Sequence, residues 1–139
     1  MNRRDAITQI AATAATVAFP AWGAASRIVL GQSAAFSGPA KALGEQFKQG
    51  ALLQFDRVNA RGGVAGRTIE LQSVDDGYEP DRCAANTRKL IDEGAFALFG
   101  YIGTPTSLAA LPLVNAAKIA FVAPFTGADA LRAPFSRAL

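Results

Sequence analysis

The feature that most restricts the fold of this chain is a regular alternation of two hydrophobic patterns between residues 27 and 123. Short apolar runs predict buried strands at residues 27–33, 68–74, 96–100 and 119–123. Between these runs, apolar or small residues recur at every third or fourth position, which predicts helices at residues 43–58, 80–93 and 104–117. Strands that alternate with helices form a parallel sheet, because each helix returns the chain across one face of the sheet. The sequence therefore predicts an α/β fold with a three-layer parallel sheet.

The residue types that are missing exclude most enzyme chemistry. The chain has no histidine and a single cysteine, Cys83, so a Ser-His-Asp triad, a Cys-His pair and a His/Cys zinc site cannot form. The 14 basic and 11 acidic residues are scattered, without the basic run or stripe that is typical of nucleic-acid binding. We therefore expect a protein that is not an enzyme, needs no metal or cofactor and has no nucleic-acid partner.

The first 25 residues predict an export signal. Arg3 and Arg4 precede a modestly apolar stretch that ends at Phe19, and small residues follow it. The stretch is shorter than the roughly 20 apolar residues that span a bilayer. The paired arginines favour the twin-arginine route, with ordinary secretion as the alternative. No cysteine stands at the end of the stretch, so a lipoprotein is not expected, and we predict a soluble mature chain, residues 26–139, in the periplasm.

The loop after the first predicted strand does not fit a nucleotide site. Its sequence, GQSAAFSGPAK at residues 31–41, has six residues between its two glycines and an alanine after the lysine. A phosphate-binding P-loop reads G-x-x-x-x-G-K-[ST], and the dinucleotide pattern G-x-G-x-x-G is absent as well. We interpret the segment as a flexible connection with Phe36 at its surface, at the edge where parallel sheets bind ligands.

Two further loops carry the best candidates for a binding site. Residues 100–106 and 124–128 each follow a predicted strand, and the carboxyl ends of parallel strands meet at one edge of a sheet. Thr104 and Thr126 supply hydroxyls, Phe125 supplies an apolar wall, and the free amides at the start of a helix suit a carboxylate. The alternative is that Thr104 only caps its own helix. With no acid, base or metal nearby, the loops predict recognition of a solute and not catalysis.

Asp75 and Asp76 end the second predicted strand. Neighbouring strand residues point to opposite faces and no further ligands are nearby in sequence, so we expect a solvated strand end with a capping role instead of a metal site or acid pair. Cys83 falls on the apolar face of the next predicted helix, where a buried thiol acts as a small hydrophobic side chain. Neither feature predicts a reaction centre.

Five short motifs together resemble one protein family. They lie between Arg27 and Arg132, and in chain order they read S-x-x-F-S-G-P, N-A-R-G-G-V-A-G-R, D-D-G-Y-E-P, G-T-P-T-S and A-P-F-T-G-A. Their order and spacing are similar to those of the leucine/isoleucine/valine-binding family of extracytoplasmic solute receptors, which serve ABC importers. Each motif alone is weak, but the set is specific. The resemblance implies a flavodoxin-like or Rossmann-like lobe of a type I periplasmic binding protein.

The resemblance also implies a site. In this family two α/β lobes close on an amino acid, and the first lobe holds its α-carboxylate. Carried onto this sequence, the site residues are Thr104 with its neighbouring amides, Phe125, Thr126 and Gly127, with Tyr101 and Phe36 as further neighbours. Residues 26–139 correspond to an incomplete first lobe, and the second lobe is missing from the chain. We therefore expect a binding component for a branched-chain amino acid or a related carboxylate, with an ABC permease in the inner membrane as partner.

Two departures from the family are visible. Some members carry a disulfide between the second-strand region and the G-T-P-T-S loop, where this chain has Gly77 or Tyr78 and Gly103. Phe125 is bulkier than the small residue expected of leucine binders, which argues against an aliphatic ligand. Two alternative functions stay open at this point. They are the sensor domain of a receptor with the same fold, and a flavodoxin-like or nucleotide-dependent enzyme, which the spacing in residues 31–41 disfavours.

Overall fold

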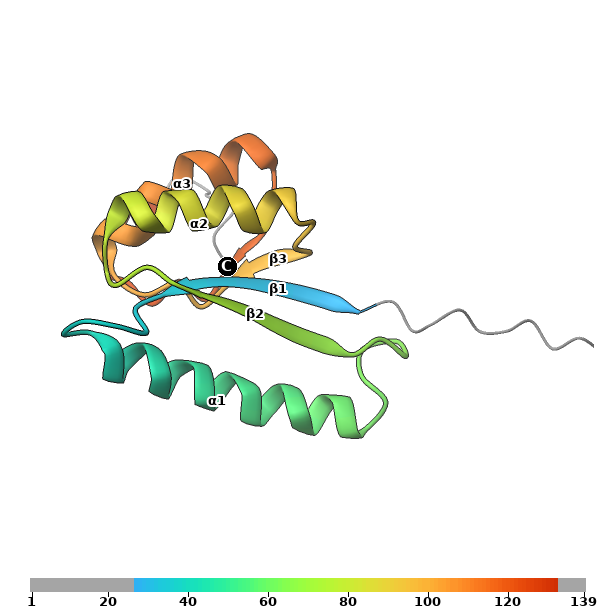
Figure 1. Cartoon of the computed structure of the whole chain (residues 1–139). Helices are drawn as coiled ribbons and strands as arrows, with labels where there is room; N and C mark the ends of the chain where they lie inside the picture. The colour runs from blue at the N-terminus through green and yellow to red at the C-terminus, as the bar shows by residue number, and fades with distance from the viewer. Residues whose placement is uncertain (1–26, 133–139) are drawn as a thin grey trace, which may run out of the picture.

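Four parallel strands form one sheet in the computed structural model of this chain, which describes residues 27–132 (Figure 1). The strands are β1 (Ile28–Ala34), β2 (Ile69–Asp75), β3 (Ala97–Phe99) and β4 (Phe121–Val122). Their order in the sheet is β2-β1-β3-β4, and every neighbouring pair is parallel. The predicted parallel sheet is confirmed, whereas the predicted export signal at residues 1–25 lies outside the described residues.

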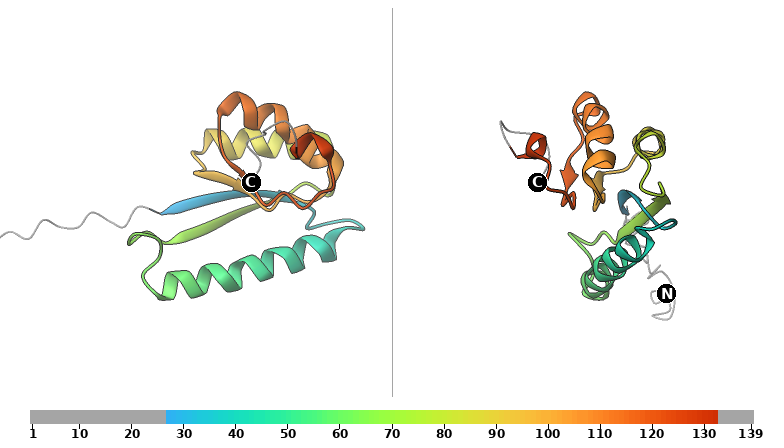
Figure 2. Two further views of the ribbon diagram at one scale, coloured as in Figure 1. Left: turned by 180° about the vertical axis from the view of Figure 1, so that it is seen from behind. Right: turned by 90° about the vertical axis from the view of Figure 1, so that its left-hand side faces the viewer.

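Helices cover both faces of this sheet, so the predicted three layers are confirmed. Helix α1 (Lys41–Ala60) lies on one face, while α2 (Pro80–Asp92) and α3 (Thr104–Ala117) lie side by side on the other (Figure 1, Figure 2). A short 3-10 helix, η1 (Asp129–Leu131), follows β4 and is not predicted from the sequence. Among residues 27–132, no helix is both long enough and apolar enough to cross a membrane.

The main core lies between the sheet and the layer formed by α2 and α3. Leu90 of α2, Val114 of α3, Leu98 of β3 and Phe121 of β4 are fully buried there. Fully burying an apolar side chain of this size contributes roughly 1.5–3 kcal/mol to stability. Cys83 belongs to the same cluster, which confirms its predicted buried position, and burial raises the pKa of its thiol to about 12.

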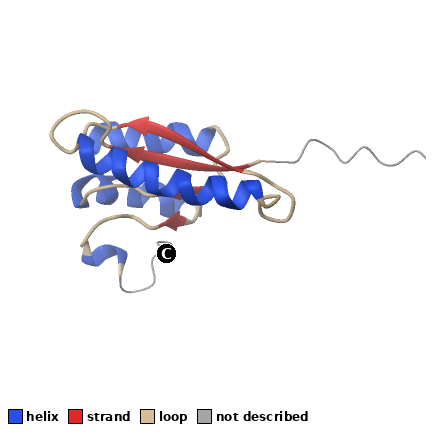
Figure 3. Cartoon of the chain, turned by 90° about the horizontal axis from the view of Figure 1, so that it is seen from below, coloured by secondary structure: helices blue, strands red, loops and turns tan. Residues whose placement is uncertain are grey.

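The α1 face is less tightly covered. Phe55 of α1 packs edge-on against Phe99 of β3 with ring centroids 5.3 Å apart, but Gly44 is the one residue of α1 that is buried. Seen from this side, α1 runs along the two long strands and β4 lies to one side of it (Figure 3). A side chain at Gly44 would collide with the backbone carbonyl of Ala35. This glycine therefore lets the first turn of α1 approach the carboxyl end of β1.

Candidate functional site

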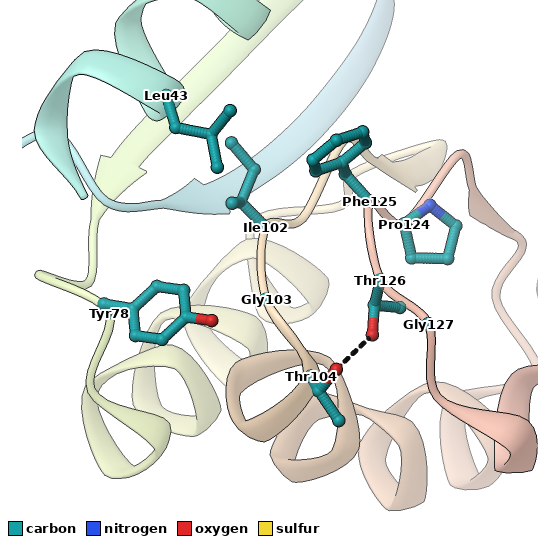
Figure 4. Close-up of a pocket in the computed structure, with 9 residues that line it drawn as sticks. All are labelled: Leu43, Tyr78, Ile102, Gly103, Thr104, Pro124, Phe125, Thr126 and Gly127. Atoms are coloured by element: carbon teal, nitrogen blue, oxygen red, sulfur yellow. Dashed lines mark hydrogen bonds between the residues drawn. The ribbon is translucent and has the colours of Figure 1, made fainter.

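A cleft of about 420 Å³ lies at the carboxyl edge of the sheet. It is formed by the first turn of α1, the loop before α2, the loop between β3 and α3, and the loop after β4 (Figure 4). The lining residues are Leu43, Tyr78, Ile102, Gly103, Thr104, Pro124, Phe125, Thr126 and Gly127. The strand order reverses between β1 and β3, and open α/β sheets bind ligands beyond the carboxyl ends of strands at such a point.

Backbone pairing brings the two predicted binding loops together. Ile102 and Phe125 form a parallel bridge beyond the ends of β3 and β4, and the Gly103 amide donates to the Phe125 carbonyl at 3.1 Å. As a result, the hydroxyls of Thr104 and Thr126 lie 2.8 Å apart and share a hydrogen bond. The structure places in one cleft four of the six predicted site residues, namely Thr104, Phe125, Thr126 and Gly127.

Thr104 does not cap helix α3. The helix begins at Thr104 itself, Gly103 occupies the capping position, and the cap makes no side-chain hydrogen bond. In the first turn of the helix, the Thr106 hydroxyl donates to the carbonyls of Ile102 at 2.5 Å and Gly103 at 3.0 Å and caps no amide either. The alternative that Thr104 only caps its own helix is therefore wrong, and its hydroxyl bonds to Thr126 instead.

The polar part of the cleft contains hydrogen-bond donors that have no acceptor among the described residues, 27–132. The hydroxyls of Thr104 and Thr126 carry two protons, and their mutual bond uses one of them, so one proton stays available in either arrangement. The amides of Thr104 and Gly127 have no acceptor within residues 27–132. Since the amino terminus of α3 also carries partial positive charge, these donors suit an anion.

Sequence reasoning missed the wall of the cleft that faces these donors. Its principal member is Tyr78, which follows β2 with a left-handed φ of 69°. Its ring lies against Gly103, where an added Cβ would overlap the ring and where the backbone φ is 100°. The D-D-G-Y turn offers a signal, because it follows a predicted strand at the same sheet edge as the binding loops. The other lining residues not singled out from the sequence are Leu43, Ile102 and Pro124.

Asp76 holds the loop that carries Tyr78, and the expectation of a solvated strand end is wrong for this residue. Asp76 is fully buried and accepts hydrogen bonds from the Ser33 hydroxyl and from the Tyr78 amide, both at 2.8 Å. Burial raises the pKa of Asp76 above its ordinary value. The capping position of α2 is occupied by Glu79, so Asp76 supports the loop and not the helix start.

Asp75 joins the loop after β1 to the loop after β2. Its Oδ1 accepts the amides of Phe36 at 2.7 Å, Ser37 at 3.1 Å and Gly77 at 3.0 Å. Its Oδ2 accepts the Ser37 hydroxyl at 2.6 Å and the Arg82 guanidinium at 3.0 Å. Burial raises the pKa of Asp75, but these hydrogen bonds outweigh burial and hold the pKa well below its usual range.

Two predicted site residues lie outside the cleft. Tyr101 is fully buried, with its ring packed edge-on against Phe121 at a centroid distance of 4.9 Å and its hydroxyl 3.0 Å from that of Thr87. Phe36 lies beside α1, where the Lys48 ammonium is 5.2 Å from its ring centroid. The structure thus corrects both predictions, since Tyr101 belongs to the core and Phe36 does not line the cleft.

Comparison with known proteins assigns most of the chain to one family profile. Residues 27–136 match the family described as periplasmic binding protein. The Leu/Ile/Val-binding protein BraC3 from Rhizobium johnstonii is 33% identical over 86 residues, which cover 62% of this chain and 23% of the relative.

Solved structures resemble this chain over a similar region. A possible leucine/isoleucine/valine-binding protein from Rhodopirellula baltica SH 1 aligns with a TM-score of 0.75 at 42% identity, over 78% of this chain and 30% of that chain. The fatty acid ABC transporter substrate-binding protein from Thermomonospora curvata aligns with a TM-score of 0.67 at 30% identity, over 71% of this chain and 25% of that chain. The chain therefore spans about a quarter to a third of the length of these proteins.

Proposed function

This chain belongs to the periplasmic binding protein family, and on that premise we propose that residues 26–139 form the first ligand-binding lobe, itself incomplete, of a solute-binding protein that serves an ABC importer. The proposed role is binding without catalysis. The solute is an amino acid or a related carboxylate, and the partner is a permease in the inner membrane. Residues 1–25 are proposed to direct export to the periplasm.

The observation that carries this proposal is the set of unused donors in the cleft. One hydroxyl proton of the Thr104–Thr126 pair and the amides of Thr104 and Gly127 are without an acceptor within residues 27–132. A carboxylate offers two oxygens with about four lone pairs, so it can accept all three. The names of the relatives agree with such a solute, because one is a Leu/Ile/Val-binding protein and another a fatty acid ABC transporter substrate-binding protein.

The proposed mechanism depends on contacts that a solute makes with two lobes, of which this chain provides the first. Contacts that a solute makes with both lobes favour the closed state, and closure reports occupancy to the permease. Three hydrogen bonds to a carboxylate at about 1.5 kcal/mol each give roughly 4.5 kcal/mol, which corresponds to a dissociation constant on the order of 1 mM. We therefore expect the chain alone to bind weakly.

The first test compares isovalerate with isovaleramide, which has the same shape and no charge. Each is titrated into the full chain labelled with ¹⁵N, and amide shifts are followed by NMR. Isovalerate is expected to shift the Thr104 and Gly127 amides with a dissociation constant of about 1 mM, and isovaleramide is expected to leave them nearly unchanged. Equal shifts with both compounds contradict the proposal.

The second test uses the sharing of one proton between two hydroxyls. In Thr104→Val the Thr126 hydroxyl still donates, and in Thr126→Val the Thr104 hydroxyl still donates, so each single variant loses less than about threefold in affinity. The double variant has no hydroxyl proton left and loses about tenfold. Thr68→Val, an exposed threonine outside the cleft, is the matched control. If the losses of affinity in the two single variants add up to the loss in the double variant, each hydroxyl acts independently. That result contradicts the shared-proton arrangement.

A further inference from the structure

Large exposed apolar side chains gather around the cleft. Binding of a carboxylate group alone does not require them. Within residues 27–132, seven large hydrophobic side chains are exposed. Three of them line this cleft, namely Leu43, Tyr78 and Phe125, with exposed fractions of 41%, 39% and 54%. A concentration of exposed apolar surface in a hollow with a few polar groups is typical of a small-molecule site.

The two aromatic rings stand on opposite sides of the segment that carries the donors. Figure 4 shows Tyr78 on one side of residues 102–104 and Phe125 on the other, with the threonine pair below and Leu43 above. A ligand whose acid group bonds to Thr104 and Thr126 therefore has apolar side chains close by, on the same wall of the cleft as Ile102.

Both aromatic residues are held in place by contacts within the protein that need no ligand. The Tyr78 backbone is fixed in its left-handed conformation by the hydrogen bond from its amide to the buried Asp76. The Phe125 backbone is fixed by the bridge to Ile102, and its ring lies 6.0 Å from that of Phe47, centroid to centroid. Preorganised rings lose little conformational entropy when a ligand binds.

The charge of the lining residues distinguishes among acids. None of the nine lining residues is a lysine, arginine, aspartate or glutamate. The ammonium group of an amino acid therefore has no counter-charge on this surface and would lose hydration without compensation. A simple carboxylic acid carries no such group.

Resting on the function proposed above, we propose that this cleft selects carboxylates with a planar aromatic ring, of which benzoate is the simplest, and that Tyr78 and Phe125 are its specificity-determining residues. The acid group bonds to the free hydroxyl proton and amides, and the ring of the ligand packs against the aromatic side chains of Tyr78 and Phe125. Aromatic pairs gain attraction beyond the burial of area, and a saturated ring of equal size does not.

The experiment titrates benzoate, cyclohexanecarboxylate and leucine into the full ¹⁵N-labelled chain. Benzoate is expected to bind about two- to tenfold more tightly than cyclohexanecarboxylate, and leucine more weakly than either. Phe125→Leu keeps an apolar side chain without the ring, so it removes the preference for benzoate while cyclohexanecarboxylate binds as before. Tyr78→Leu gives the same result, and the dispersion of the amide spectrum verifies that each variant is folded.

The matched control is Phe96→Leu, because Phe96 is an exposed phenylalanine, 63% exposed, that does not line the cleft. It is expected to leave the preference unchanged. Equal affinity for benzoate and cyclohexanecarboxylate, tighter binding of leucine, or an unchanged preference in Phe125→Leu overturns this inference and leaves carboxylate binding intact. If none of the three acids shifts the Thr104 and Gly127 amides, the proposed function fails and this inference fails with it.

Discussion

Replacing Asp75 by alanine removes the acceptor that joins the loops after β1 and β2. Three amides, those of Phe36, Ser37 and Gly77, lose the oxygen to which they donate at 2.7–3.1 Å. The Asp75 side chain is 32% exposed, so water replaces part of what is lost. At about 1 kcal/mol for each amide, Asp75→Ala lowers the free energy of unfolding by about 3 kcal/mol.

Asp75→Asn has nearly the same shape as the wild type but no charge. It therefore distinguishes the contribution of the charge from that of the three hydrogen bonds donated by backbone amides. The remaining Oδ1 still accepts the three amides, and the Ser37 hydroxyl can turn to accept from the new Nδ2. The main loss is the ion pair with Arg82, in which both side chains are about a third or more exposed. Exposed ion pairs contribute about 0–1 kcal/mol, so Asp75→Asn lowers stability by about 1 kcal/mol.

Urea unfolding followed by circular dichroism near neutral pH measures both variants. Asp56→Ala is the control, because Asp56 is exposed on α1 and its side chain makes no hydrogen bond or ion pair within residues 27–132. It is expected to change stability by less than about 0.5 kcal/mol. Equal losses of stability in Asp75→Asn and Asp75→Ala would show that the charge of Asp75, and not the three hydrogen bonds from backbone amides, provides the stabilisation. A loss below about 1 kcal/mol in Asp75→Ala would refute the assignment of Asp75 as the joint between the loops.

The difference in stability between wild type and Asp75→Asn depends on pH, and the shifted pKa of Asp75 determines the direction of this dependence. The pKa of Asp75 is lower in the folded chain than in the unfolded chain, so the unfolded chain binds a proton more readily. The contribution of Asp75 is complete above its unfolded pKa of about 4 and is lost as the pH falls toward the folded value. The difference in stability between wild type and Asp75→Asn should therefore stay constant above about pH 5 and shrink as the pH falls from about 4 to about 2. A difference that stays constant over this window would rule out this linkage.

Two further predictions concern glycine and cysteine. Gly103→Ala is expected to lower the free energy of unfolding by about 2–3 kcal/mol in urea unfolding, because alanine is strained at a φ of 100° and its Cβ would displace the Tyr78 ring. Gly50→Ala is its control, since the space around Gly50 in α1 is open and alanine stabilises a helix by roughly 0.5–1 kcal/mol; equal losses would contradict the argument. Cys83 is expected to resist iodoacetamide at mildly alkaline pH, because it is fully buried with a pKa of about 12. Mass spectrometry should detect alkylation only after urea is added, and rapid alkylation without urea would place the thiol outside the core.

The fold is predictable from this sequence because the hydrophobic periods are long and uninterrupted. Helix α3 has the predicted bounds, Thr104–Ala117, since threonine and proline favour its start and the apolar spacing continues to its end. The last two strands are shorter than predicted, three and two residues instead of five each. Gly100 and Ala123 adopt left-handed φ values of 64° and 50°, which turn the chain out of the sheet, and apolar composition does not report such turns.

The site is only partly predictable, and Tyr101 shows why. The proximity of Thr104 and Thr126 can be predicted from the sequence, because parallel strands place their following loops at one edge of the sheet. Tyr101 comes from the same loop, but side chains of an extended segment alternate, so Ile102 lines the cleft while Tyr101 enters the core beside α2. Loop membership thus identifies the region, and the direction of each side chain needs the structure.

Tyr78 depends on a buried carboxylate that no local pattern reveals. Its left-handed backbone is unfavourable for a residue with a large side chain, and an unfavourable conformation persists only where the surroundings impose it. Here the surroundings are Asp76, fixed in turn by the Ser33 hydroxyl of β1, and Gly103, whose missing side chain admits the ring. The Tyr78 ring thus joins the loop after β2 to the loop after β3. In the proposed site its other face contacts the ligand, so one side chain would serve both structure and recognition.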